Sequence, residues 1–386
     1  MKKKHLSIFA VVLTASVVLS THSTMALGGA TQPTVTTPST STTEPVIPPV
    51  DNSSLNLSLE DALKAMETGN SMLKLDDSKI LIYEKQKDQA LARQGVAKNS
   101  PVVDEDSKKA LDLNYKRAQW TLDNAKHDRE TLLKSLKAQI TNEYESVLTL
   151  KLQSENLKTQ QANLETVIAQ VNLQIKLGTK ISSEIYSYNA QKSKLQAAQN
   201  TILNTINSSM ITLQQDLGMD INRKVVLNSK LIEYTKFKDA DFNNMTAKAL
   251  QTSYDVTKYK QDIEITQIEY DIDFYYADLA ADQVQLSIED KKGTLANLPN
   301  TLVVGYRTAY NTLKSLENTI EADKLTVEAD QINVSVMQKT IDAGQASSLQ
   351  MIALQNTLLN DQYTQQQDIN AYMTAAVNLQ NSLDNK

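Results

Sequence analysis

Few side chains in this sequence could take part in catalysis, and they are not grouped. The chain of 386 residues has three histidines and no cysteine. His5 and His22 lie in an N-terminal leader, so His127 is the single histidine of the remaining chain. One histidine on a predicted helix surface is usually solvated, and one histidine builds neither a Ser–His–Asp triad nor a zinc site. We therefore predict that the protein is not an enzyme and has neither catalytic residues nor a cofactor.

Two short acidic runs are the candidates for metal binding: Asp76 with Asp77, and Asp104 with Glu105 and Asp106. Carboxylate oxygens are the ligands that Ca²⁺ takes in proteins. Neither run has the spacing of a known calcium loop, so we interpret both as solvated charge and predict no metal site.

The N-terminus has the pattern of an export signal. A basic "MKKKH" is followed by the apolar "LSIFAVVLTASVVLS" and by small residues near Ala26. This pattern predicts a signal peptide over residues 1–26, with an uncleaved membrane anchor as the alternative. Residues 27–56 are rich in Pro, Thr and Ser, which predicts a disordered or extended tether. We expect an exported protein of the extracytoplasmic cell envelope.

The charge balance argues against a nucleic-acid partner. Cleavage after residue 26 would leave 36 basic against 45 acidic side chains, and basic runs are absent from the rest of the chain. Nucleic-acid binding depends on clustered Lys and Arg that neutralise phosphates.

Long helices are predicted for the whole chain after the tether. Beyond Pro49 only Pro101 and Pro299 remain, and glycines are few, so the chain has few places to turn. Positions from 136 to 175 in alternating steps of four and three are mostly apolar, which is a seven-residue repeat. Positions 306 to 341 in steps of seven are all apolar as well. A helix over about 107–176 would be roughly 100 Å long and needs neighbours along its length.

The sequence contains an internal repeat. Sliding the chain on itself by 166 residues aligns about fifty residues without a gap, and both copies break once, at a Gly-x-x-x-Ser. The aligned positions are Gly178 with Gly344, Ser182 with Ser348, and Glu184 with Gln350. A glycine in the left-handed conformation ends a helix, and the serine could cap the next one with Glu184 early in its first turn. Each copy is therefore predicted to be a long antiparallel helical hairpin.

These patterns divide the chain. We predict a first hairpin repeat over 57–218, an irregular connector over 219–241 and a second hairpin repeat over 242–386. The outer turn of the first repeat is expected in the loop 95–109. The outer turn of the second repeat is expected near 270–290, without an exact position. Pro299 is not interpreted as this turn, because it would be a kink or a helix start.

Aromatic residues are densest in "IEYDIDFYYADLAADQ", residues 268–283. A constriction or partner surface is one interpretation. We favour packing between neighbouring helices, where a tyrosine ring and its hydroxyl can face different media. We interpret Trp120 in the same way, as a residue that packs between neighbouring helices.

Taken in order, these residues resemble the TolC-like outer-membrane efflux protein family. A signal peptide precedes "LSLEDALKAMETGNSMLKL", and each hairpin has a Tyr 34 residues before its Gly-x-x-x-Ser, namely Tyr144 and Tyr310. The break is followed by Glu or Gln, by Ile or Met, and by Asn or Gln four residues on. Leu217-Gly218 closes the first half. The resemblance covers most of 57–385.

The resemblance implies an all-α, elongated protomer that trimerises into a hollow α-barrel of twelve helices. The hairpin tips would dock a membrane-fusion adaptor, which connects the conduit to an inner-membrane transporter. By resemblance, the docking positions are Gly178, Ser182, Glu184, Gly344, Ser348 and Gln350.

One feature departs from the family pattern. Members that pierce an outer membrane insert two β-strands in each half, of about ten alternating residues each. Residues 95–109 hold no such strand, so we predict no transmembrane β-barrel, and association with an outer membrane is not expected on this ground. The alternative function is a secreted structural coiled-coil stalk or scaffold with no transport role.

Overall fold

The computed structural model describes residues 54–385 except 101–103 and 347. The predicted signal peptide and most of the tether lie outside the described residues. The first part contains β1 (Leu55–Leu57), α1 (Leu59–Gly69), α2 (Ser71–Lys98), α3 (Glu105–Asp112), α4 (Asn114–Lys176) and α5 (Glu184–Asp216). The second contains β2 (Val225–Leu227), α6 (Phe242–Gln251), α7 (Tyr254–Tyr276), α8 (Asp278–Asp342) and α9 (Ser348–Leu383).

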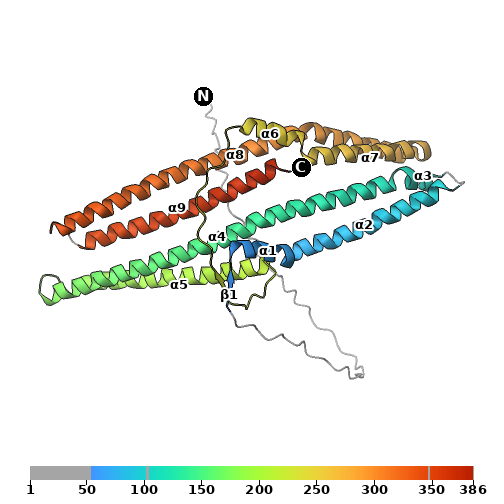
Figure 1. Ribbon diagram of the computed structural model, residues 1–386. Coiled ribbons are helices and arrows are strands. Elements are labelled where there is room, and N and C mark those ends of the chain that lie inside the picture. The colour runs from blue at the N-terminus through green and yellow to red at the C-terminus, as the bar shows by residue number, and fades with distance from the viewer. Residues whose placement is uncertain (1–53, 101–103, 347, 386) are drawn as a thin grey trace, which may run out of the picture. The chain divides into compact units, whose positions relative to one another are not determined.

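The predicted all-α architecture of long helical hairpins is confirmed (Figure 1). α4 has 63 residues and α8 has 65, which corresponds to about 95–100 Å each at 1.5 Å per residue. α5 packs back along α4, α9 packs back along α8, and α4 and α9 pack against each other. Within the described residues, no helix combines the length and apolar character that crossing a bilayer requires.

The predicted seven-residue repeats face the interior. Leu136, Ile140, Val147, Leu157, Leu164 and Val171 of α4 are buried. Tyr306, Leu313, Ile320 and Val327 of α8 are buried too. A strict seven-residue spacing keeps one stripe of a helix against its neighbour over many turns, so these long helices bury apolar surface without a compact core.

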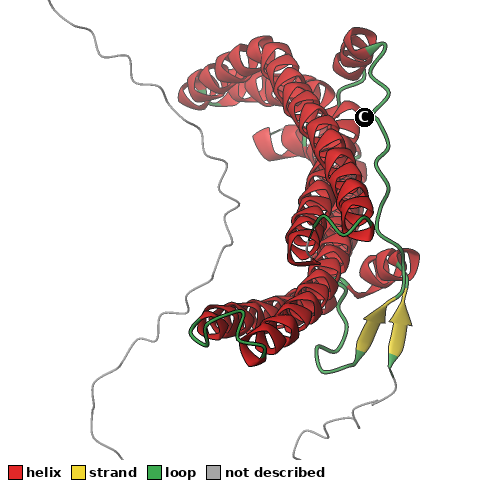
Figure 2. Cartoon of the chain, turned by 90° about the vertical axis from the view of Figure 1, so that its left-hand side faces the viewer, coloured by secondary structure: helices red, strands yellow, loops and turns green. Residues whose placement is uncertain are grey.

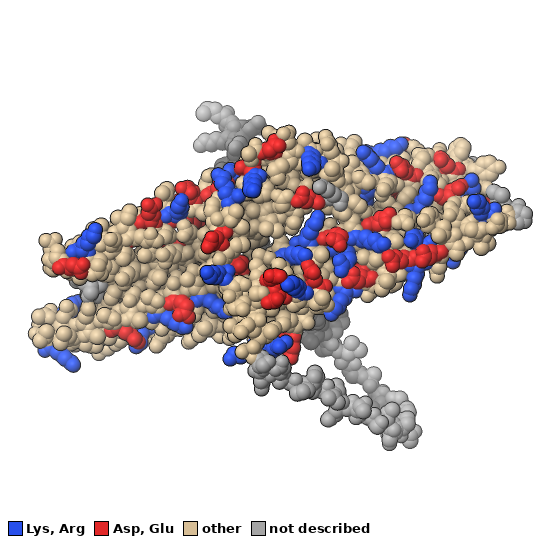
Figure 3. All heavy atoms as spheres, viewed as in Figure 1, with Lys and Arg blue, Asp and Glu red and all other residues tan. Residues whose placement is uncertain are grey.

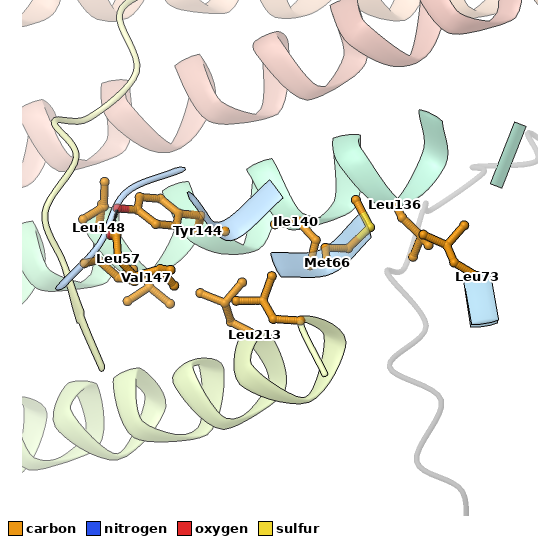
Figure 4. Close-up of a cluster of buried hydrophobic side chains, with 12 residues drawn as sticks. Leu57, Met66, Leu73, Leu136, Ile140, Tyr144, Val147, Leu148 and Leu213 are labelled. Carbon is orange, nitrogen blue, oxygen red and sulfur yellow. Dashed lines mark hydrogen bonds between the residues drawn. The ribbon is translucent and has the colours of Figure 1, made fainter. Parts of the chain in front are cut away.

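The core of the first half gathers where α1, α4 and α5 meet β1 (Figure 4). Met66 and Leu213 pack around Ile140, and each fully buried side chain of this kind contributes about 1.5–3 kcal/mol. Tyr144 lies beside them with its hydroxyl donating to Leu57 O at 2.8 Å. The same hydroxyl accepts from Ser229 N at 3.1 Å, so one buried tyrosine attaches both β1 and the chain after β2 to α4.

The segment between α5 and α6 joins the two halves. β2 pairs in parallel with β1, with Leu57 opposite Leu227. Beyond β2 the chain crosses α4 and α9 (Figure 1). Phe237 N donates to the Tyr372 hydroxyl at 2.8 Å, and the Tyr310 hydroxyl donates to Asp239 at 2.8 Å. Together with the Tyr144 hydroxyl, which accepts from Ser229 N, these bonds show that side chains from both halves hold the crossing segment in place.

Seen along the helices, the long helices of residues 54–385 lie in a curved layer (Figure 2). β1, β2 and the crossing segment lie on the convex side of this layer. On the face shown in Figure 3, acidic and basic side chains are intermixed, and neither sign forms a continuous patch.

The structure bears on three expectations about helix boundaries, of which the third, an outer turn near 270–290, agrees with it. The helix predicted over about 107–176 is split at Leu113 into α3 and α4. Pro299 lies inside α8, so of the two alternatives predicted for it the helix start is wrong. The unplaced outer turn is at Ala277, whose φ of −155° and ψ of 79° separate α7 from α8.

The aromatic stretch near this turn serves two roles. Ile272 is buried with Leu113 and Ile265, and Trp120 and Tyr276 pack against them, as the packing interpretation expects. Phe274 and Tyr275 are exposed, however, so that interpretation is wrong for these two residues. Seven-residue spacing does not distinguish them, since the tight turn at Ala277 leaves them without a facing helix.

Candidate functional site at the hairpin tips

We call the turn over residues 177–183, between α4 and α5, the first tip. Gly178 has a φ of +74°, in the left-handed region. Its N–H donates to Ile175 O at 3.0 Å, and Thr179 N donates to Gln174 O at 2.9 Å. This pair of bonds is a Schellman motif, which satisfies the last carbonyls of a helix and reverses the chain.

We call the turn that begins at Ala343, between α8 and α9, the second tip. Gly344 has a φ of +73°, and its N–H donates to Ile341 O at 2.8 Å. Gln345 N donates to Thr340 O at 3.0 Å. The two tips thus close with the same bonds at aligned positions. A Cβ at Gly178 or Gly344 would meet no atom within 4 Å, so backbone conformation and not space requires glycine here.

The return helices begin differently from the prediction. Ser182 lies exposed in the first tip and does not cap α5. The residue before α5 is Ser183, which has helical dihedrals and no side-chain capping bond. Glu184 occupies the first turn as predicted, and Lys180 Nζ donates to its Oε2 at 2.6 Å. This bond raises the pKa of Lys180.

The second tip is described less completely. Ser348 begins α9, and its side chain lies outside the described residues. Gln350 follows in the first turn and is exposed. Of the residues singled out from the sequence, the structure therefore places Gly178, Ser182 and Glu184 in one turn and Gly344 in the matching one.

Large apolar side chains surround the first tip without being covered. Leu173, Leu177, Ile181 and Tyr186 are 57%, 69%, 67% and 73% exposed. Exposed apolar side chains near one turn are a candidate surface for binding a partner. Sequence reasoning missed these residues. Their signal was present, since they are apolar side chains close to the glycine that fall outside the seven-residue seam.

The bases of the two tips pack together. Val167 and Val171 of α4 are buried with Ile185 of α5, and Ile352 of α9 packs on the same cluster. Both turns accordingly lie at the same end of the helices (Figure 1).

Amide side chains hold α4 and α9 in register below the tips. Asn156 Nδ2 donates to Leu359 O at 2.8 Å, and Gln160 Nε2 donates to Asn360 Oδ1 at 3.0 Å. Asn156 and Gln160 are buried, where an unpaired amide would be costly. A shift of one hairpin along the other would break these bonds, so the amides fix the relative height of the two tips.

Comparison with known protein families finds no match to this chain, and comparison with curated proteins finds none. Solved structures do match. CusC, reported for folding and transmembrane channel formation, aligns with a TM-score of 0.65 at 10% identity over 86% of this chain and 93% of its own. The outer-membrane channel OprN aligns with a TM-score of 0.64 at 10% identity over 85% of this chain and 90% of its own. The CmeC outer membrane channel of Campylobacter jejuni aligns at 0.62 and 11% identity over 85% of each chain.

The chain has a TolC-like fold. These solved structures are of channel proteins.

Within the part of the chain that the structure describes, α5 and α8 leave apolar side chains uncovered at two edges of the TolC-like unit. α5 packs mainly on α4, and α8 packs on α6, α7 and α9. Leu203 and Ile211 of α5 remain exposed, as do Leu325 and Ile332 of α8, which are seven residues apart. Leu325 and Ile332 lie on the face of α8 turned away from the buried stripe, and sequence reasoning missed them too.

The residues first considered for chemistry have structural partners. The His127 ring stacks on Tyr254 with centroids 3.5 Å apart. Asp76 pairs with Lys79 at 2.8 Å and Asp77 with Arg129, while Asp104 caps α3 by accepting from Ser107 N at 2.8 Å. Among the described residues, no group of three or more His, Asp and Glu side chains is arranged to hold a metal ion.

Proposed function

We propose that this protein forms an oligomeric helical conduit in the cell envelope and takes part in efflux or secretion. The observation that carries the proposal is the pair of matching tips. Both close with a Schellman motif, both lie at one end of the helices, and their bases pack together. A structural stalk needs neither duplicated turns nor turns of equal height.

The unpartnered edges support assembly. Leu203 and Ile211 on α5, and Leu325 and Ile332 on α8, are large apolar side chains left in water. Bringing the α5 edge of one copy against the α8 edge of the next would bury both sets of side chains, because α5 and α8 lie at opposite borders of the long helices (Figure 1). Repeated around an axis, this contact closes a ring, and the resemblance implies three copies.

The measurement that tests the conduit is the mass of residues 27–386 in solution, by light scattering coupled to size exclusion. We expect a trimer with high helicity by circular dichroism. A dimer of parallel chains would overturn the conduit and leave the structural stalk.

We further propose that the tips dock a membrane-fusion adaptor, through which the conduit meets an inner-membrane transporter. Gly178, Ser182, Glu184, Gly344, Ser348 and Gln350 shape the proposed surface. The exposed Leu177 and Ile181 would supply its apolar anchors, since interfaces concentrate binding energy in a few such side chains.

Docking is tested by replacing an anchor with a charge. Leu177→Asp together with Ile181→Asp should weaken binding to a purified membrane-fusion adaptor protein by at least about tenfold. Leu81→Asp, at an exposed position on α2, is the matched control and should bind normally. Binding can be followed by biolayer interferometry. Equal loss in the control, or no loss at the tip, would contradict docking at the first tip.

A further inference from the structure

A cavity of about 190 Å³ lies where α4, α9 and the crossing segment meet. Thr141 and Glu145 line it from α4, Met373 and Val377 from α9, and Ile232 from the crossing segment. Its lining is mostly apolar. A cavity of about 150 Å³ is large enough for benzene, so this one has room for a small aromatic ring with a short polar arm.

Glu145 is the unusual member of this lining. Its side chain is buried, and Oε2 accepts from Ile232 N at 2.9 Å. Among the described residues, this N–H is the one hydrogen-bond donor given to the carboxylate, and no Lys or Arg forms an ion pair with it. Burial accordingly raises the pKa of the Glu145 carboxyl, and the Ile232 N–H lowers it. A buried carboxylate without a countercharge is costly to retain.

Holding the crossing segment does not explain a charge at this position. Accepting one backbone N–H needs a single oxygen, which a glutamine would supply equally well. The Tyr372 hydroxyl already performs that task for Phe237 N with a neutral group. A carboxylate facing a mostly apolar cavity is the arrangement that recognises a cation.

The lysines at the cavity do not supply this cation. Lys134 Nζ donates to Asp384 O at 3.2 Å, and Lys137 pairs with Glu67 at 2.5 Å. Asn370 is also occupied, since its Nδ2 donates to Thr149 Oγ1 at 2.6 Å. The position opposite Glu145 is thus left for a molecule from outside.

We propose that this cavity binds a small organic ammonium ion, whose nitrogen forms an ion pair with Glu145 and whose apolar body contacts Met373 and Val377. All of its walls come from one chain, so the proposal is independent of assembly and of the conduit function. A bound ion would connect α4, α9 and the crossing segment, and it would therefore stabilise the junction between the two halves.

A series of matched ligands tests the proposal on the unaltered full chain at pH 7.5. Benzylamine is charged, benzyl alcohol is neutral and benzoate is anionic, and all three have similar size. Isothermal titration calorimetry should give an affinity for benzylamine at least about tenfold above that for benzyl alcohol, and no benzoate binding. Absence of benzylamine binding, or equal affinity for the alcohol, would overturn the proposal.

Variants and a spectroscopic probe locate the site. Glu145→Gln keeps the acceptor for Ile232 N and should remove the preference for benzylamine. Glu143→Gln, two residues away on α4 and not part of the lining, should keep it. In a spectrum of ¹³C-methyl methionine, benzylamine should shift the Met373 signal and leave that of the exposed Met72 in place. The spectrum needs no Glu145 variant, and an unshifted Met373 signal would place the ligand elsewhere and refute the site.

Discussion

At the scale of single residues, backbone conformation decides what the tips require. Gly178 and Gly344 have φ near +74° and +73° with open space around them. The situation of Gly69 and Gly218 is different, because a Cβ on Gly69 would lie 2.1 Å from Leu217 O. Glycine is needed in the tips for its dihedral freedom and at the Gly69 contact for the close approach of two backbones.

Two substitutions at Gly344 in the second tip test whether glycine is needed there for its dihedral freedom. Gly344→Val should lower the free energy of unfolding by about 1–2 kcal/mol, because a β-branched residue is strained in the left-handed region. Gly344→Asn should cost clearly less, since asparagine tolerates that region. Urea unfolding followed by circular dichroism measures both. Equal losses for the two variants would mean that the left-handed conformation is not what the glycine provides.

At the scale of elements, carboxyl pairs lie along both hairpins. Gln139 Nε2 donates at 2.8 Å to Glu143 of α4 and at 2.8 Å to Asp216 of α5. Burial, with the neighbouring Asp216, raises the pKa of Glu143 to about 7. In the second hairpin, burial and the facing Asp368 raise the pKa of Asp323 to about 6. These helices are therefore most stable against each other when one carboxyl of each pair is protonated.

The sign of the resulting pH dependence follows from linkage. The folded pKa of Glu143 lies above its ordinary value of 4.5, so its contribution is complete below about pH 4.5 and is lost as pH rises through 7. Between pH 5 and 8 this group should cost the native protein up to about 3 kcal/mol. Glu143→Gln should remove most of that loss, because an amide keeps the hydrogen bonds and does not ionise.

Urea unfolding at pH 5 and pH 8 measures this difference. Glu155→Gln is the control, since Glu155 is a solvated partner of Lys158 and its replacement should leave the pH dependence unchanged. If the free energy of unfolding of Glu143→Gln equalled that of the native protein at both pH values, the Glu143–Asp216 pair would not be the cause of the pH dependence.

At the scale of the whole molecule, the exposed stripe on α8 predicts how copies meet. Leu325 and Ile332 are more than half exposed and lie on the face of α8 turned away from the buried stripe. Replacing both by lysine should change the protein from the proposed trimer to a monomer with its helicity retained, because a charge buried at an interface is costly while an exposed lysine is not.

Light scattering measures the oligomeric state of the variant, and circular dichroism measures its helicity. Leu75→Lys together with Ile82→Lys, seven residues apart on the exposed surface of α2, is the matched control for added charge. A variant on α8 that stayed trimeric would remove this stripe from the interface.

The sequence by itself determined the class of structure, the hairpins and the turn glycines. The seven-residue spacing predicts which stripe of each helix is buried, although it does not identify the helix that packs against this stripe. It also determined the matching of Gly178 with Gly344, because the repeat aligns them directly.

Tertiary structure decided the remainder. Pro299 lies inside α8, Ala277 forms the outer turn, and Ser182 does not cap α5 as predicted. The cavity at Glu145 depends on α4, α9 and the crossing segment together. The cavity arises from contacts between residues far apart in the chain, and these contacts leave no periodic signal in the sequence.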